Sequence, residues 1–220
     1  ASMIRADLGY SSLRPTSRTF PSMMTTSPCR MSSPVAVMMR PALMTTTSSS
    51  SGREGTAAVA VREILSAADG SLWASLNAHL PALSEASPGE FLDALEHALA
   101  QDPSPFAEVF AQEGDAMFGG TYMSGLLWAL ETLAWDAEYL GRVTLCFGGL
   151  AAIDPGGRWS NRPGNSLRTI FLPWLPQTCA SVSRRGAAIS ALRNELPDIA
   201  WHLLLDLLPE SHATSMGTRK

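Results

Sequence analysis

The side chains best suited to chemistry lie close together in the middle of the sequence. Two arginines, two asparagines and a tryptophan occupy one short run, namely Arg158, Trp159, Asn161, Arg162 and Asn165. Guanidinium groups hold phosphate oxygens through paired hydrogen bonds, and an indole ring stacks on a nucleobase. The run therefore has the residue types of an anion or nucleotide site.

The same side chains also have a structural explanation. Residues 154–157, Asp-Pro-Gly-Gly, predict the end of a helix, because proline lacks a backbone amide and glycine adopts the left-handed conformation of a helix terminus. We therefore expect a long non-helical connector over residues 154–177. Its backbone groups would need hydrogen-bond partners, which arginine and asparagine supply. We favour this explanation, because such a segment needs partners whether or not it binds a ligand.

The remaining chemistry-bearing residues lack the spacing of a known site. No histidine lies three or four residues from another histidine or a cysteine, so we expect no metal site and no cofactor. The glycine pairs at 148–149 and 156–157 follow no predicted strand and bracket no Lys-Ser pair, which argues against a phosphate loop. These absences favour a protein that is not an enzyme.

The three cysteines are widely spaced and form no CxxC pair. Their odd number argues against a disulfide framework and favours a reducing, cytoplasmic location. Cys146 lies in an apolar helical pattern, where a thiol is normally a small hydrophobic group. Cys179 lies in a predicted loop and is the better candidate for a reactive thiol, although no histidine is near it in the sequence.

Charge and composition exclude further classes of function. The net charge of -4 argues against a nonspecific nucleic-acid binder, and 45% hydrophobic residues are enough for a real core. No apolar run reaches the roughly 18 residues of a membrane-spanning helix. No predicted helix pairs a basic face with a strongly apolar one, so we expect no membrane-surface binding either.

Composition divides the chain into three parts. Residues 1–55 are rich in Ser, Thr, Met and Pro, with almost no acidic residues, and we expect a disordered tail. The same composition occurs in organelle transit peptides, or the tail is translated sequence upstream of the natural start. Residues 56–210 are the expected helical domain, and residues 211–220 a loop or a truncated end.

Helical periodicity runs through the whole of that domain and predicts an all-α fold. We expect about eight helices in an irregular bundle or an α-solenoid-like array, with segments at 57–68, 71–80, 87–99, 105–112, 122–135, 137–153, 181–195 and 197–208. Residues 122–135 and 137–153 are apolar over much of their circumference, which places them at the centre. The last segment is equally apolar and must be buried or must await a partner.

Three local patterns make sharper predictions. Ser87 and Glu90 have the spacing of a capping box, and Ser181 is placed to cap the helix that follows it. Gly148 and Gly149 lie inside a predicted helix, where each costs roughly 1 kcal/mol relative to alanine. They indicate either close backbone packing or simple divergence.

The connector and its flanks also resemble a known kind of protein. The run GGRWSNRPGNSLRTIFLPWLPQT, with PSPFAEVFAQEGDAMFGGTYMSGLLWALETLAW before it and SHATSMGTRK after it, resembles a helical region near the C-terminal side of very large bacterial proteins. Some of those are built like multidomain NTPase or defence proteins. The resemblance covers about 56–218 and implies an all-α regulatory or scaffolding segment. It departs at Gly148-Gly149, Arg184 and Gly217, and no NTPase segment is present.

Two functions follow from these observations. The first is a non-catalytic helical interaction or scaffolding module, a fragment or copy of a larger bacterial protein, which binds a protein partner or a neighbouring domain through apolar helix faces. The alternative is a ligand-binding or enzymatic domain with an anion or nucleotide site at the connector. The first is favoured, because the connector needs its polar groups for its own backbone.

Overall fold

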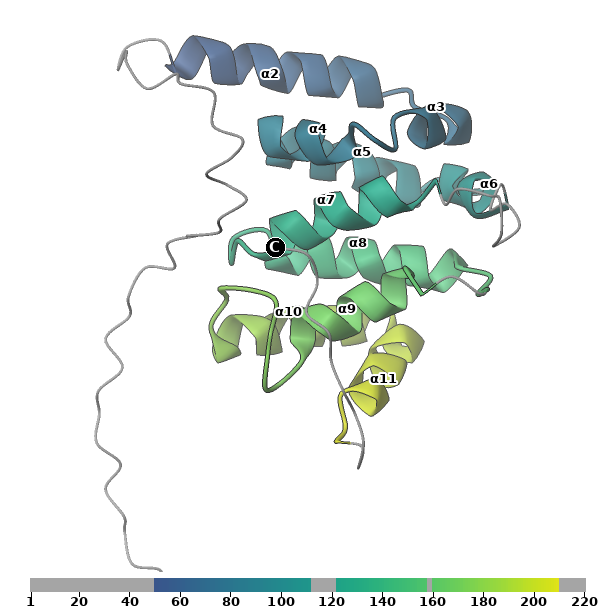
Figure 1. Cartoon of the computed structure of the whole chain (residues 1–220), viewed down its shortest axis with the longest axis vertical. Coiled ribbons are helices and arrows are strands. Elements are labelled where there is room, and N and C mark those ends of the chain that lie inside the picture. Colours follow the sequence, from purple (N-terminus) through teal and green to yellow (C-terminus); the bar gives the residue numbers. More distant parts are fainter. Residues whose placement is uncertain (1–49, 112–121, 158–159, 210–220) are drawn as a thin grey trace, which may run out of the picture. The chain divides into compact units, whose positions relative to one another are not determined.

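The described part of the chain is built from helices alone. A computed structural model describes residues 50–111, 122–157 and 160–209, and within these it contains ten α-helices and no strand (Figure 1). The helices are α2 (Ser50–Leu65), α3 (Gly70–Ser75), α4 (Leu80–Ala86), α5 (Pro88–Leu99), α6 (Pro105–Ala111), α7 (Ser124–Ala134), α8 (Leu140–Ile153), α9 (Pro163–Phe171), α10 (Val182–Glu195) and α11 (Pro197–Asp206). The all-α prediction is confirmed.

The helices stack on one another in the order of the sequence. Helix α2 contacts α4 and α5, α4 contacts α7, and α7 contacts α9. Behind them α5 contacts α8 and α8 contacts α10, so that two rows of helices run along the array (Figure 1). Helix α11 contacts α8, α9 and α10. This is the arrangement of an α-solenoid-like array, in which most helices are covered by earlier and later ones.

Helices α7 and α8 form the centre, as their sequences predict. Each buries apolar side chains on several sides, including Leu127 and Leu130 of α7 and Val143 and Phe147 of α8. A Cβ atom on Gly148 would lie 2.5 Å from Cδ1 of Leu192 in α10. Close packing of α8 against α10, and not divergence, therefore accounts for this glycine.

The start of α7 requires a glycine for a related reason. The backbone amide of Gly125 donates a hydrogen bond of 2.7 Å to the side-chain oxygen of Asn77, in the segment between α3 and α4. A Cβ atom on Gly125 would lie only 1.6 Å from the backbone carbonyl oxygen of Asn77. Glycine is thus the residue that lets these two backbone segments touch.

The predicted helix ends are correct at some positions and wrong at others. Ser181 caps α10, because its hydroxyl accepts a hydrogen bond from the amide of Arg184. Ser87 makes no such bond, so the predicted capping box is wrong, and Glu90 pairs with Arg62 of α2 instead. Helix α2 begins at Ser50, which makes residues 50–55 helical and corrects the predicted boundary at 56.

The predicted non-helical connector is the main correction. Asp154 ends α8 and Gly156 follows with a φ of 75°, as the stop signal requires. Helix α9 then occupies the middle of the segment. Its first residue is Pro163, whose fixed φ and missing amide suit the first helical position. Its buried face carries Pro163, Ser166, Leu167, Ile170 and Phe171, a helical pattern hidden by the surrounding Pro, Asn and Arg residues. The non-helical parts are the short segments on either side of α9.

Other expectations concern residues outside the described ranges. These are the tail over 1–49 and the end over 211–220. Within the ranges that the structure describes, no helix has both the length and the apolar character needed to cross a membrane.

Candidate functional site

The predicted polar cluster is centred on an ion pair between two helix ends. Nη1 of Arg162 lies 2.7 Å from Oδ1 of Asp154, and the two side chains are only 9% and 11% exposed. The same Asp154 oxygen accepts a hydrogen bond of 2.8 Å from the amide of Gly156. Arg162 precedes α9 and Asp154 follows α8, so this pair fixes the turn between the two helices. The guanidinium faces a carboxylate of its own chain.

The other members of the cluster are less closely gathered. Nδ2 of Asn165 donates a hydrogen bond of 2.7 Å to the carbonyl oxygen of Ser160, and Asn161 is partly buried. Arg158 and Trp159 lie outside the described residues. The contacts of Arg162 and Asn165 are those expected of groups that stabilise their own segment. Binding of an anion or nucleotide by these residues stays a prediction.

A half-buried carboxylate of α7 faces α9. The hydroxyl of Ser166 donates a hydrogen bond of 2.7 Å to Oε1 of Glu131. Burial raises the pKa of Glu131, and the hydrogen bond from Ser166 opposes that rise. The two residues are far apart in the sequence and belong to no motif, so sequence reasoning missed them. They join α7 to α9 and form no catalytic arrangement with a second titratable group among the described contacts.

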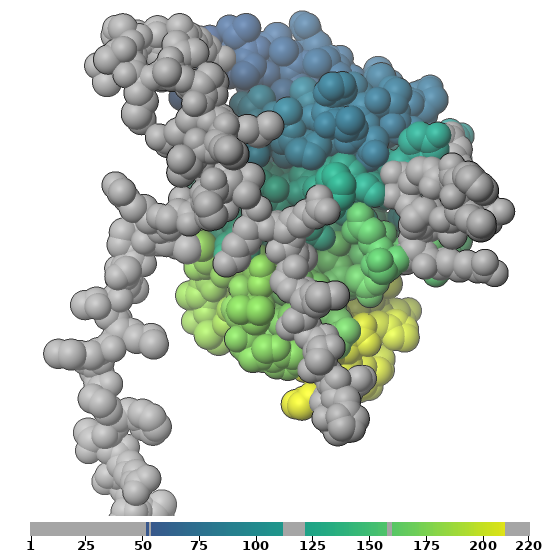
Figure 2. Space-filling view, viewed as in Figure 1, coloured from purple at the N-terminus to yellow at the C-terminus, as the bar shows by residue number. Residues whose placement is uncertain are grey.

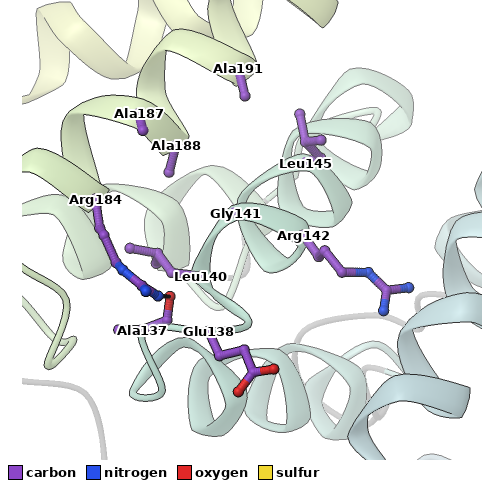
Figure 3. A pocket seen from close by; sticks show the side chains of 10 residues that line it. All are labelled: Ala137, Glu138, Leu140, Gly141, Arg142, Leu145, Arg184, Ala187, Ala188 and Ala191. Carbon is purple, nitrogen blue, oxygen red and sulfur yellow. Dashed lines mark hydrogen bonds between the residues drawn. The ribbon is translucent and has the colours of Figure 1, made fainter.

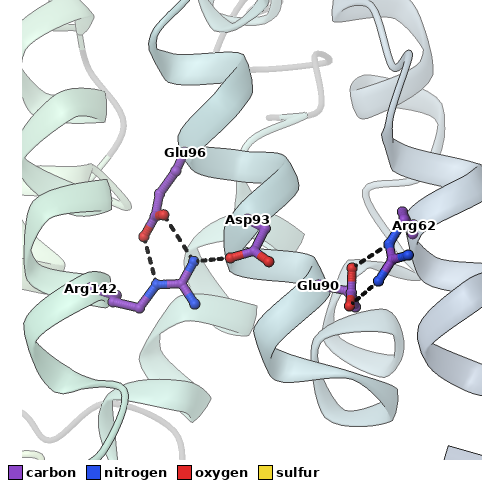
Figure 4. Close-up of polar contacts among 5 residues, drawn as sticks. All are labelled: Arg62, Glu90, Asp93, Glu96 and Arg142. Carbon is purple, nitrogen blue, oxygen red and sulfur yellow. Dashed lines mark hydrogen bonds and ion pairs between the residues drawn. The ribbon is translucent and has the colours of Figure 1, made fainter. Parts of the chain in front are cut away.

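A row of carboxylates on α5 links three helices (Figure 4). Glu90 binds Arg62 of α2 through two hydrogen bonds of 2.8 and 2.6 Å. One turn further on, Asp93 and Glu96 both bind Arg142 of α8. Arg142 therefore holds α8 to α5. Hydrogen bonding to Glu96 is the main cause of a raised pKa for Arg142, and bonding to Arg62 lowers the pKa of Glu90. These ion pairs connect helices, and each of the three carboxylates on α5 has an arginine partner.

A shallow pocket of about 460 Å³ lies between the N-terminal half of α8 and α10 (Figure 3). Its lining is Ala137, Glu138, Leu140, Gly141, Arg142, Leu145, Arg184, Ala187, Ala188 and Ala191. Arg184 closes one end, where its Nη1 donates a hydrogen bond of 3.0 Å to the carbonyl oxygen of Ala137. Small aliphatic side chains make up most of the wall, and Glu138, Arg142 and Arg184 are its charged residues.

Cys146 supplies no reactive thiol. Cys146 in α8 is buried, and burial, together with the charge of Glu96, raises the pKa of its thiol to about 12. It is a small hydrophobic group, as predicted, because the thiolate is not formed at neutral pH. Cys179 lies between α9 and α10, where its backbone amide donates a hydrogen bond of 3.1 Å to the carbonyl oxygen of Trp135, and its role as a reactive thiol stays a prediction.

The most distinctive surface of the described residues is the outer face of α11. Trp201 is 61% exposed, Leu204 39%, Leu205 44% and Leu208 58%. Trp201, Leu204 and Leu205 have the spacing i, i+3 and i+4 and lie on one side of the helix, and Leu208 follows two residues beyond its last residue, Asp206. The opposite side carries buried Ala200 and Leu203, which pack on the array. We call the four exposed residues the α11 stripe. In Figure 2 the yellow atoms, which belong to the C-terminal end of the described residues, lie at the surface beside the green atoms of earlier residues.

The sequence analysis named an apolar last helix but not its two-sided character. The apolar residues of this segment occupy more than one face of a helix, and this pattern in the sequence could have indicated a buried face and an exposed one. Among the described residues no group of three His, Cys, Asp or Glu side chains is arranged to hold a metal ion. No family model, no curated protein and no solved structure matches the chain.

Proposed function

We propose that the chain is a non-catalytic helical interaction module that binds a protein partner or a neighbouring domain through the α11 stripe. The observation that carries this proposal is the exposure of Trp201, Leu204 and Leu205 on one side of a helix whose other side is packed, with exposed Leu208 just beyond the end of the helix. Exposed apolar residues that stand singly are normal, whereas contiguous ones mark interaction surfaces. Tryptophan is also the residue most enriched among interface residues that dominate binding energy.

The first helix of the array provides a contrast. Helix α2 also exposes two apolar side chains, Val59 and Ile64, at 49% and 41%. They are five residues apart, and Arg62 and Glu63 stand between them, so they form no continuous stripe. Helix α11, in contrast, exposes three apolar residues at the spacing i, i+3 and i+4, which supports a binding role for α11.

The polar groups of the described residues support the same proposal. Arg62 of α2, Arg142 of α8 and Arg162 before α9 each form an ion pair with a carboxylate of the same chain. The shallow pocket has mostly aliphatic walls, and its charged lining residues are Glu138, Arg142 and Arg184. If the chain is part of a larger protein, the same stripe would dock on a neighbouring domain.

Selection from a random library of helical peptides tests this proposal. The wild-type chain is expected to enrich amphipathic helices, and a Trp201→Ser, Leu205→Ser variant is expected to lose at least about tenfold in affinity for them. A Val59→Ser, Ile64→Ser variant of α2 is the matched control and should bind as the wild type does. Circular dichroism checks that both variants remain folded. Failure to enrich any helix, or equal binding by the Trp201 variant, would refute the proposal.

A further inference from the structure

We infer that the partner of the α11 stripe is an amphipathic helix edged with lysine or arginine, and not a second copy of this chain. This inference rests on the proposed function and adds the chemistry of the partner. It follows from the way covered helices are packed in the array, from the charged residues beside the stripe, and from the length of the stripe.

The packing within the array indicates that the partner is a helix. Every apolar helix face that is covered among the described residues is covered mainly by other helices. The α11 stripe has the same spacing as those covered faces. It spans residues 201–208, of which 201–206 are helical, and is roughly 10 Å long. An antiparallel or parallel helix with apolar residues at i, i+3, i+4 and i+7 matches this spacing.

The charges on α11 indicate that the edge of the partner is basic. Asp198, His202 and Asp206 follow one another at intervals of four residues and form the exposed polar side of α11, beside the stripe. Helix α11 contains two aspartates and no lysine or arginine. No ion pair joins Asp198 or Asp206 to another described residue. A lysine or arginine on the partner would meet these carboxylates at the rim of the contact, where charge steers association.

The same charges oppose pairing of α11 with itself. A two-fold pairing of two stripes would bring Asp198 of one copy and Asp206 of the other to the same edge, and like charges there are destabilising. The whole chain carries a net charge of -4, which adds to that repulsion. A stripe of this length also falls well short of the roughly 800 Å² that each partner contributes to a stable complex. The expected complex with a basic helix is therefore weak, with a Kd in the micromolar range.

Two synthetic peptides test the inference directly. Both carry leucines at i, i+3, i+4 and i+7, and the positions beside the leucines are lysine in one peptide and glutamate in the other. Calorimetry with the full chain should show at least about tenfold tighter binding of the lysine peptide at low salt, and a smaller preference at high salt because salt screens exposed charges. An Asp198→Asn, Asp206→Asn variant should lose most of this preference and still bind the lysine peptide through the leucines.

The outcomes separate the inference from the proposed function. Equal binding of both peptides, or failure to bind the lysine peptide while library selection still yields helices, overturns the basic partner and leaves the stripe as a docking surface. Sedimentation that shows a dimer abolished by Trp201→Ser also overturns it, in favour of a second copy. If library selection yields no helix at all, the proposed function fails as well. A lysine preference that survives in the double asparagine variant shows that other charges are responsible and refutes the role of α11.

Discussion

The central helices and the last helix have similar apolar sequences but opposite surroundings. Helices α7 and α8 bury leucines on several sides, because earlier and later helices of the array pack against both. Helix α11 buries Ala200 and Leu203 on one side and exposes Trp201, Leu204 and Leu205 on the other, with exposed Leu208 just beyond its end. Its helical neighbours are α8, α9 and α10, which all precede it. The place of a helix in the array, and not its apolar content, decides whether its second face is covered.

This difference separates two kinds of apolar residue within one fold. At the centre, apolar residues are fixed by close packing. At Gly125 and Gly148 the packing leaves no room for a Cβ atom. On the outer face of α11 the same residue types are exposed, and under the proposed function they contact a partner. Substitutions should therefore be costly at the centre, intermediate on the inner face of α11 and nearly neutral on the stripe.

The largest effect is expected at the start of α7. Gly125→Ala places a Cβ atom where the backbone carbonyl oxygen of Asn77 lies, at 1.6 Å, and backbone cannot move aside as a side chain can. We expect a loss of more than about 4 kcal/mol in the free energy of unfolding, or no folded protein. The control is Gly141→Ala inside α8, where a Cβ atom meets nothing within 4 Å and alanine should stabilise the helix by up to about 1 kcal/mol. Urea unfolding of both variants checks this, and similar stabilities would contradict the packing described at the centre.

Three leucines test the comparison itself. Leu130 in α7 is fully buried, Leu203 on the inner face of α11 is 3% exposed, and Leu204 next to it belongs to the stripe. Replacement by alanine should cost about 3 kcal/mol at Leu130 and about 2 kcal/mol at Leu203, because each leaves a cavity. At Leu204 the cost should stay below about 0.5 kcal/mol. Chemical denaturation measures all three. A cost at Leu204 equal to that at Leu203 would mean that the stripe is part of the core.

The sequence was informative where one local signal decides the structure. Pro197 marks the start of α11, Ser181 caps α10, and the broad apolar character of α7 and α8 placed them at the centre. It failed at α9, because Pro163 and the polar residues around it indicated a connector while the helical face of Leu167 and Ile170 was overlooked.

Contacts between segments that are far apart in the sequence could not be predicted from the sequence. The pairing of Arg142 with Asp93 and Glu96 depends on how α5 and α8 are stacked, and no local pattern encodes it. For Arg162 and Asn165 in the predicted site, the sequence analysis offered two roles, binding of a ligand and stabilisation of their own segment. The contacts with Asp154 and Ser160 match the structural role, and these contacts exist only once α8 and α9 are in place.

The smallest effect is expected from the half-buried carboxylate at the centre, and it depends on pH. Burial raises the pKa of Glu131 in the folded state above its ordinary value of 4.5, so the folded protein holds this proton more tightly than the unfolded chain. The resulting stabilisation is fully present below the ordinary pKa and is lost as the pH rises through the raised one. Glu131→Gln removes this dependence, because a neutral amide replaces the carboxyl group. The variant should therefore gain stability relative to wild type as the pH rises from acid to neutral.

Ser166→Ala removes the hydrogen bond that opposes the rise in pKa, so the pKa of Glu131, followed by NMR titration, should increase further. A lowered pKa in that variant, or a Glu131→Gln effect that is the same at every pH, would show that α7 and α9 do not shield this carboxylate from water.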